Sequence, residues 1–321
     1  MSMQLYPIKF VPVLKPTIWG GDCIAAFKSL KSDRHDIGES WEISAVEGSE
    51  SIAANGCYSG MSLPEMSRRF GVELLGTKVV ERFGNTFPLL IKFIDAHHDL
   101  SIQVHPGEQL ARRRHNASGK SEMWYLLSGN PEARIYAGFA KPLTPAKFRR
   151  LVADNNLLPS LGCYESHEGD VYYLAAGTIH AIGAGNFMVE IQESSDITYR
   201  VSDYGRLGAD GKPRELHVEQ AIDALDFWPN PGIRRTVQPD TDAELVCCAH
   251  FNVGRICVDG RRDIATDGES FIAFVCTAGS GRIVTAGGSD ISIKRGESVL
   301  IPAALKSFTV DGTLTLLTAS L

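Results

Sequence analysis

Short segments of alternating or continuous apolar residues, separated by turn residues, recur along most of the chain. They lie at 101–105, 122–127, 170–174, 187–191, 271–277, 282–286 and 298–301. Short strands with turn signals between them are typical of sandwiches and barrels, whereas a parallel sheet needs helical segments between its strands. The pattern therefore predicts a mainly β protein.

Three segments have sequence features of helices. The segment 62–75 opens with a serine followed by proline in the first turn, and 144–153 opens in the same way with threonine and proline. In 217–225 the apolar residues fall on one helix face. The stretch 229–241, with three prolines and a glycine, indicates a linker between domains. A few short helices are therefore expected beside the strands.

Length and charge narrow the classes of protein. A chain of 321 residues with 44% hydrophobic residues has enough apolar material for two or three packed units. Its net charge of −6 argues against a nucleic acid or an anionic membrane as partner, because such surfaces require a basic excess. No apolar run approaches the length of a membrane-spanning helix. An anionic substrate would need a few local cations to hold it.

The seven cysteines are odd in number, are scattered along the chain and form no CxxC pair. The N-terminal twenty residues lack the pattern of a secretory signal. Together these features predict reduced thiols in a cytoplasmic protein and argue against a structural zinc site built from cysteines.

Two segments share one frame. Residues 169–180 have the form of the second motif of the cupin family, Gly-x5-Pro-x-Gly-x2-His, with Ala175 at the proline position and His180 at the end. Residues 296–307 fit the same frame, with Ala304 for the second glycine and Ser307 for the histidine. This similarity predicts two jelly-roll barrels, of which the second has no metal site. The expected division is a catalytic domain over 1–228, with a small helical insert near 144–160, and a degenerate domain over 240–321.

Four polar side chains form a candidate metal site. On a strand through 101–105, Gln103 and His105 point to the same side because they are two residues apart. Glu122 begins an apolar run, and His180 stands at the turn described above. Any one of these residues alone would more often be an ordinary core or surface residue than a metal ligand. Two imidazoles, one carboxylate and one amide oxygen together suit a divalent metal of borderline softness, with zinc the first choice.

With these motifs, the chain resembles the type I mannose-6-phosphate isomerase family in its short bacterial form. The resemblance is most specific in Ser101-Ile-Gln-Val-His-Pro106, in Gly119-Lys-Ser-Glu-Met-Trp124 and over 177–200. It implies one Zn²⁺ per chain, bound by Gln103, His105, Glu122 and His180, and an active-site arginine at Arg200. It also implies that the substrate pocket contains Lys92, Ser101, Lys120 and Glu190.

The residues themselves support these roles. Lys120 lies two positions from Glu122, and a lysine beside a divalent cation is a candidate proton-transfer group near neutral pH. Glu190 has apolar neighbours on both sides, so its carboxylate would face a barrel interior, where it is costly unless it is paired or functional. Arg200 could pair with that carboxylate or bind a phosphate or enediolate oxygen. The sequence leaves open whether Lys120 or Glu190 transfers the proton.

The expected reaction interconverts D-mannose 6-phosphate and D-fructose 6-phosphate through a cis-enediol, with a small sugar phosphate as the partner. Two alternatives remain at this point. A cupin oxidase or dioxygenase would use the same fold with iron, although such sites tend to contain more histidines. A sugar-phosphate sensor without catalysis would have lost a ligand or the basic residues, and the first motif has lost none. The oligomeric state is left open.

Overall fold

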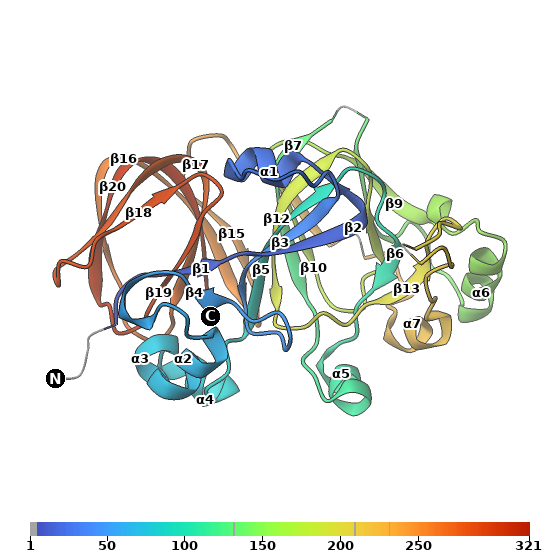
Figure 1. The fold of residues 1–321 in the computed structure, drawn as a ribbon. Helices are drawn as coiled ribbons and strands as arrows, with labels where there is room; N and C mark the ends of the chain where they lie inside the picture. Colours follow the sequence, from blue (N-terminus) through green and yellow to red (C-terminus); the bar gives the residue numbers. More distant parts are fainter. Residues whose placement is uncertain (1–4, 131, 209, 231) are drawn as a thin grey trace.

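The computed structural model describes residues 5–130, 132–208, 210–230 and 232–321. These residues form two β bodies that lie side by side, with helices at their edges (Figure 1). Three sheets hold the strands, and helices are few and short. The mainly β architecture predicted from the pattern is therefore confirmed.

The first β body consists of two antiparallel sheets. The larger sheet has the order β14-β10-β7-β12-β5-β3-β2, and the smaller has the order β13-β6-β11-β8-β9. The strands of the larger sheet are β2 (Val13–Gly21), β3 (Ile37–Ser44), β5 (Leu89–Ala96), β7 (Glu122–Gly129), β10 (Asp170–Leu174), β12 (Asn186–Glu193) and β14 (Ile233–Thr236). Those of the smaller sheet are β6 (Ile102–Val104), β8 (Arg134–Phe139), β9 (Leu161–Glu165), β11 (His180–Ile182) and β13 (Tyr199–Ser202).

The second β body is one sheet with the order β15-β16-β20-β17-β19-β1-β4, to which β18 adds beside β17. Its strands are β1 (Ile8–Val11), β4 (Ile52–Ala53), β15 (Ala243–Cys247), β16 (Asn252–Ala265), β17 (Ile272–Thr285), β18 (Ile291–Lys294), β19 (Ser298–Ile301) and β20 (Ser307–Ser320). The two predicted segments 271–277 and 282–286 form the single strand β17, because the residues between them also pair with β20. Strands β1 and β4, which come from the start of the chain, also belong to this sheet. The division into two domains between residues 228 and 240 stays a prediction.

Seven α-helices and two 3-10 turns surround the sheets in the described part of the chain. They are α1 (Cys23–Lys28), α2 (Leu63–Phe70), α3 (Val72–Leu75), α4 (Thr77–Phe83), α5 (Glu108–His115), α6 (Pro145–Ala153), α7 (Val218–Ala224), η1 (Gly56–Tyr58) and η2 (Leu158–Ser160). The predicted helix 62–75 is two helices, since Gly71 has a φ of 46° that a continuing helix does not allow. The serine and threonine caps are as predicted: Ser62 accepts from the Glu65 amide and Thr144 from the Lys147 amide. None of the described helices has the length and apolarity needed to cross a membrane.

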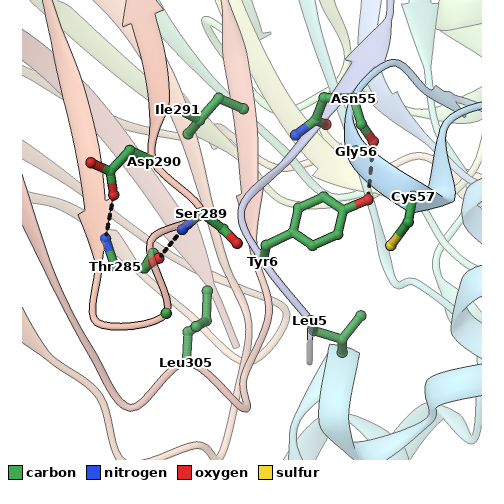
Figure 2. Close-up of a pocket in the computed structure, with 11 residues that line it drawn as sticks. Leu5, Tyr6, Asn55, Gly56, Cys57, Thr285, Ser289, Asp290, Ile291 and Leu305 are labelled. Atoms are coloured by element: carbon green, nitrogen blue, oxygen red, sulfur yellow. Dashed lines mark hydrogen bonds between the residues drawn. The ribbon is translucent and has the colours of Figure 1, made fainter. Parts of the chain in front are cut away.

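A hollow of about 600 Å³ lies where Leu5 and Tyr6, which precede β1, meet the turn at 55–57 and the turn at 285–291 (Figure 2). Most of its polar groups are hydrogen-bonded to one another. Tyr6 donates a hydrogen bond to the Asn55 carbonyl at 3.0 Å, and burial raises the pKa of its hydroxyl to about 12. The Thr285 amide donates to Asp290 at 3.1 Å. None of the predicted site residues lines this hollow.

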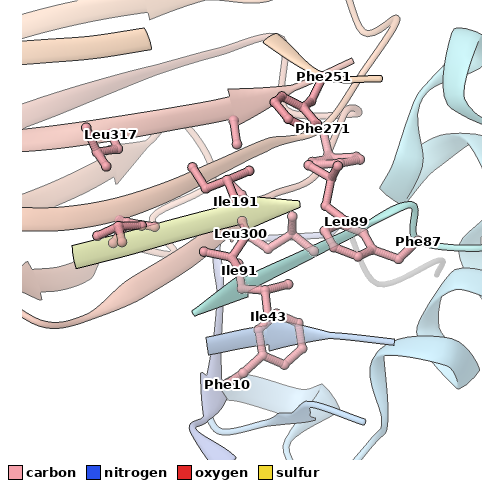
Figure 3. Packing of buried hydrophobic residues seen from close by; sticks show 14 of the residues in the cluster. Phe10, Ile43, Phe87, Leu89, Ile91, Ile191, Phe251, Phe271, Leu300 and Leu317 are labelled. Carbon is pink, nitrogen blue, oxygen red and sulfur yellow. The ribbon is translucent and has the colours of Figure 1, made fainter. Parts of the chain in front are cut away.

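The two β bodies share one apolar core (Figure 3). Ile91 and Ile191 from the first body and Leu300 and Leu317 from the second are fully buried in it. The opposite face of the second sheet carries a separate apolar cluster that includes Phe274. The interior of the first body is different, because charged side chains lie beside its apolar cluster. That polar interior is the candidate site.

Candidate metal centre and substrate cavity

Strand register places three predicted site residues in one row of the smaller sheet. His180 of β11 pairs with Gln103 of β6, and Gln103 pairs with Arg200 of β13. Directly paired residues on neighbouring strands have their side chains on the same face and about 5 Å apart. His105 follows β6 two residues after Gln103 and therefore shares its face.

A second row crosses the larger sheet. Lys92 of β5 pairs with Glu190 of β12, and Glu190 pairs with Trp124 of β7. Glu122 lies on the same face as Trp124 because the two are separated by one residue. The Trp124 ring lies 5.4 Å from the His180 ring, so the two rows face each other across the interior of the first body.

The two rows bring His105, Glu122 and His180 together. The candidate ligand atoms of this triad all lie within 4.8 Å of one another. His105 Nε2 is 3.3 Å from one oxygen of Glu122, and His180 Nε2 is 3.2 Å from the other. All three residues are at most 2% exposed. Such a buried set of two imidazoles and a carboxylate has the composition of a catalytic metal site with open positions.

Backbone carbonyls orient both imidazoles. His105 Nδ1 lies 2.8 Å from the Ile197 carbonyl oxygen, and His180 Nδ1 lies 2.9 Å from that of Thr178. Nδ1 therefore donates, and in a neutral ring the lone pair is left on Nε2, toward Glu122. Burial lowers the pKa of His180 to about 4, and burial followed by the Lys120 charge lowers the pKa of His105. Both rings are thus neutral at pH 7, the form that binds metals.

Glu122 supplies the anion of the triad. Burial alone would raise the pKa of its carboxyl, but Lys120 and the two histidines hold that pKa well below the ordinary value. One buried oxygen of Glu122 accepts no hydrogen bond from the described residues. A buried carboxylate oxygen without a donor is costly unless a cation compensates it. The triad therefore fits a divalent metal ion.

Gln103 borders the triad. Its amide nitrogen lies 3.3 Å from His180 Nε2, and its amide oxygen accepts from the Ser101 hydroxyl at 3.4 Å. A half-turn of the amide exchanges the two groups and presents the oxygen to the triad. Gln103 is thus within reach of the metal position, and its role as fourth ligand stays a prediction.

Two buried lysines are paired with carboxylates beside the triad. Lys120 contacts Glu122, and its Nζ lies 3.1 Å from His105 Nε2 and 3.7 Å from Glu190. Lys92 Nζ lies 2.9 Å from Glu190. Burial alone would lower the pKa of Lys92, but Glu190 and Glu39 more than offset this and raise it. Lys92 therefore stays charged at neutral pH and fixes Glu190 in place.

A cavity of about 390 Å³ opens beside the triad. Every predicted site residue outside the triad lines it: Lys92, Ser101, Gln103, Lys120, Glu190 and Arg200. Glu39 and Trp41 line it as well. Arg200 is half-buried, and its Nη1 donates to the Glu215 carbonyl at 3.1 Å. Burial, followed by the charges of neighbouring arginines, lowers the pKa of its guanidinium, which is still charged at neutral pH.

Sequence reasoning missed three residues of this site. Arg214 and His217 line the cavity, and Asp203 holds Arg214. They lie in the irregular segment between β13 and α7, where no periodic pattern marks which side chains turn inward. The only sequence signal was the closeness of Arg206 and Arg214 to Arg200 along the chain.

A β fold with a buried His-Glu-His triad next to a cationic cavity defines a metal-dependent enzyme of the cupin class. Residues 8–132 match the profile "Phosphomannose isomerase type I, catalytic domain", and residues 241–321 match "Mannose-6-phosphate isomerase, cupin domain". The chain is 33% identical to mannose-6-phosphate isomerase ManA of Bacillus subtilis over 97% of both chains. It is 32% identical to mannose-6-phosphate isomerase of Streptococcus mutans over 92% of both.

The similarity extends to solved structures. The crystal structure of mannose 6-phosphate isomerase from Bacillus subtilis superposes with a TM-score of 0.88 at 31% identity, covering 99% of this chain and 100% of that one. The chain therefore belongs to the type I mannose-6-phosphate isomerase family.

Proposed function

We propose that this protein interconverts D-mannose 6-phosphate and D-fructose 6-phosphate and depends on zinc for this activity. The observation that carries the proposal is the buried His-Glu-His triad at the edge of a cavity lined by lysines and an arginine. The relatives named mannose-6-phosphate isomerase support the same reaction. A small sugar phosphate is the partner, and a cytoplasmic location stays a prediction.

Four residues would hold one zinc ion per chain. His105, Glu122 and His180 supply two neutral imidazoles and one carboxylate, and Gln103 supplies an amide oxygen. Borderline donors of this kind suit zinc. When bound, such an ion acts as a Lewis acid toward the sugar oxygens.

Proton transfer between C1 and C2 of the sugar requires a group that can accept and return a proton. Glu190 and Lys120 both line the cavity and lie 3.7 Å apart. The Glu190 carboxylate is held by Lys92 at 2.9 Å and by the Trp124 indole at 2.9 Å, so its position is fixed from both sides. Lys120 reaches from Glu122 toward Glu190 and connects the metal position with that carboxylate. These two residues are the candidates for the shuttle.

Arg200 would stabilise negative charge. Its buried Nε donates no hydrogen bond to the described residues, and the ion pairs they form leave Arg200 without a carboxylate partner. A guanidinium aimed into a cavity in this way is able to bind an anionic oxygen of the substrate. It is therefore assigned to the charge that develops on the sugar or to its phosphate.

A coupled isomerase assay beside elemental analysis tests the proposal. The purified protein should turn over mannose 6-phosphate with about one zinc per chain, lose activity on chelation and regain it when zinc is returned. Oxygen consumption without isomerisation would instead indicate a cupin oxidase. Binding of the sugar phosphate without turnover, in zinc-loaded protein, would indicate a sensor.

A further inference from the structure

A cluster of cationic side chains lies at one end of the cavity, on the segment between β13 and α7. The buried carboxylate of Asp203 accepts a hydrogen bond from Arg214 Nε at 2.7 Å, and Arg214 Nη2 makes a second contact with it. Arg206 Nη2 lies 2.6 Å from the same carboxylate. Burial alone would raise the pKa of Asp203, but the hydrogen bonds and charges of the two arginines lower this pKa below its ordinary value. One carboxylate thus balances only one of two guanidiniums.

Arg214 is the member of this cluster that faces the cavity. It lines the cavity together with Arg200 and His217, whereas Arg206 is not among the lining residues. The contacts with Asp203 use the Nε and Nη2 edge of the Arg214 guanidinium, which leaves Nη1 for a ligand. The exposed carboxylate of Asp196 also lines the cavity, and Glu39 lines it within reach of Lys92 at 3.6 Å.

The order of residues across the sheet indicates which end of the substrate, the reacting carbons or the phosphate, would lie near this cluster. From the triad outward the row runs His180, Gln103, Arg200. His217 continues it, since its amide donates to the Arg200 carbonyl at 2.7 Å. Gln103, which borders the triad, is therefore separated from His217 by two strand spacings, or roughly 10 Å. In a hexose 6-phosphate the reacting C1 and C2 lie at one end of the chain and the phosphate at the other.

We propose that Arg214 binds the phosphate group of the substrate and that Asp203 is the positioning residue that holds its guanidinium toward the cavity. The inference rests on the proposed function, because that function places the reacting carbons at the triad. A guanidinium fixed on one edge by a buried carboxylate is pre-organised for an anion on its other edge. The phosphate is thereby recognised at a site separate from the residues that act on C1 and C2.

Steady-state kinetics of the full-length, zinc-loaded Arg214→Ala variant test this assignment. KM for mannose 6-phosphate should rise on the order of 10- to 100-fold, with a smaller change in kcat, because a charge-assisted hydrogen bond to the phosphate is lost. Turnover of unphosphorylated mannose should not change, so the preference for the phosphorylated sugar should fall by the same factor. Arg214→Lys should recover part of the KM, and Asp203→Asn should raise KM in the same direction.

Arg206→Ala is the matched control, since Arg206 contacts the same carboxylate but does not line the cavity. Its KM should stay near the wild-type value. A fall in kcat at unchanged KM in Arg214→Ala would overturn the assignment, because it would place the residue at the reacting end. An unchanged preference for the phosphorylated sugar would overturn it too. If Arg214→Ala does not fold, as judged by a thermal melt, the same comparison is made with Arg214→Lys.

Calorimetric titration with inorganic phosphate separates this inference from the proposed function. The zinc-loaded wild type should bind phosphate, and Arg214→Ala should bind it on the order of 10- to 100-fold more weakly, whether or not either protein isomerises sugars. Loss of phosphate binding in the variant would support the inference even if the isomerase assay failed. Equal phosphate binding in both proteins, with an active wild type, would refute the inference and leave the proposed function standing.

Discussion

At the scale of single residues, the triad combines two fixed imidazoles with one carboxylate that lacks a full set of donors. Because Nδ1 of His105 and of His180 is hydrogen-bonded to a backbone carbonyl, Nε2 is the nitrogen of each ring that faces Glu122. His105→Ala, Glu122→Ala and His180→Ala should therefore each lower bound zinc and abolish turnover, since a catalytic site with three firm protein ligands cannot spare one of them. Gln103→Ala should be milder, because a neutral amide oxygen is the weakest donor. Zinc per chain and isomerase rate are the measurements.

His98→Ala is the control for the triad variants. His98 is exposed just after β5 and is not part of the triad, so its loss should leave both zinc content and activity unchanged. Full zinc occupancy in the His180→Ala protein would contradict the assignment of the ligands.

Arg200→Ala should lower kcat/KM on the order of 10²–10³-fold while zinc stays bound, because a preorganised cation at developing charge is lost. Arg200→Lys keeps the charge without the planar fork and should recover only part of the rate. A structural role would require a carboxylate partner, yet Glu190 is taken by Lys92 and Asp203 by Arg206 and Arg214. Kinetics per zinc-loaded molecule, measured beside a thermal melt, test this. A lowered melting temperature with near-normal turnover would contradict it.

At the scale of elements, the sequence predicts features that depend on local pattern but not those that depend on the register between distant strands. Alternation along 101–105 was enough to place Gln103 and His105 on one face. The row that joins Gln103 to His180 and Arg200 depends on pairing between distant strands, which no local pattern contains. The same limit explains why Arg214 was missed, since its place in the cavity follows from a contact with Asp203 in an irregular segment.

The two segments that share the cupin frame end in different surroundings. His180 is buried and faces Glu122, whereas Ser307 is exposed at the start of β20. Ser307→Ala should therefore leave zinc content and activity near wild type, while His180→Ala should lose both. Elemental analysis gives the decisive number: two zinc ions per chain in the wild type would refute the prediction that the second body has no metal site.

At the scale of the whole molecule, the two β bodies are joined by strands and by buried charge as well as by the apolar core. Strand β1 pairs with β19, so the start of the chain is part of the second sheet. Beside this junction Lys28 and Glu42 of the first body form an ion pair at 2.7 Å, with side chains 6% and 4% exposed. Lys28 also donates to the Gly296 carbonyl, and Ser298 lies 3.5 Å from Glu42. This cluster therefore ties α1 and β3 to the turn before β19.

Removing one partner of this buried pair should destabilise the whole chain. Glu42→Gln leaves the Lys28 ammonium buried without its counter-charge, and breaking such a pair typically costs about 3–5 kcal/mol. The double variant Lys28→Met with Glu42→Gln removes both charges, so its free energy of unfolding should lie closer to wild type than that of Glu42→Gln alone. Asp36→Asn, which disrupts an exposed pair with Arg34, should leave stability near wild type. Urea unfolding of the four proteins is the measurement. If Glu42→Gln and Asp36→Asn unfold at the same urea concentration, the buried cluster does not hold the two bodies together.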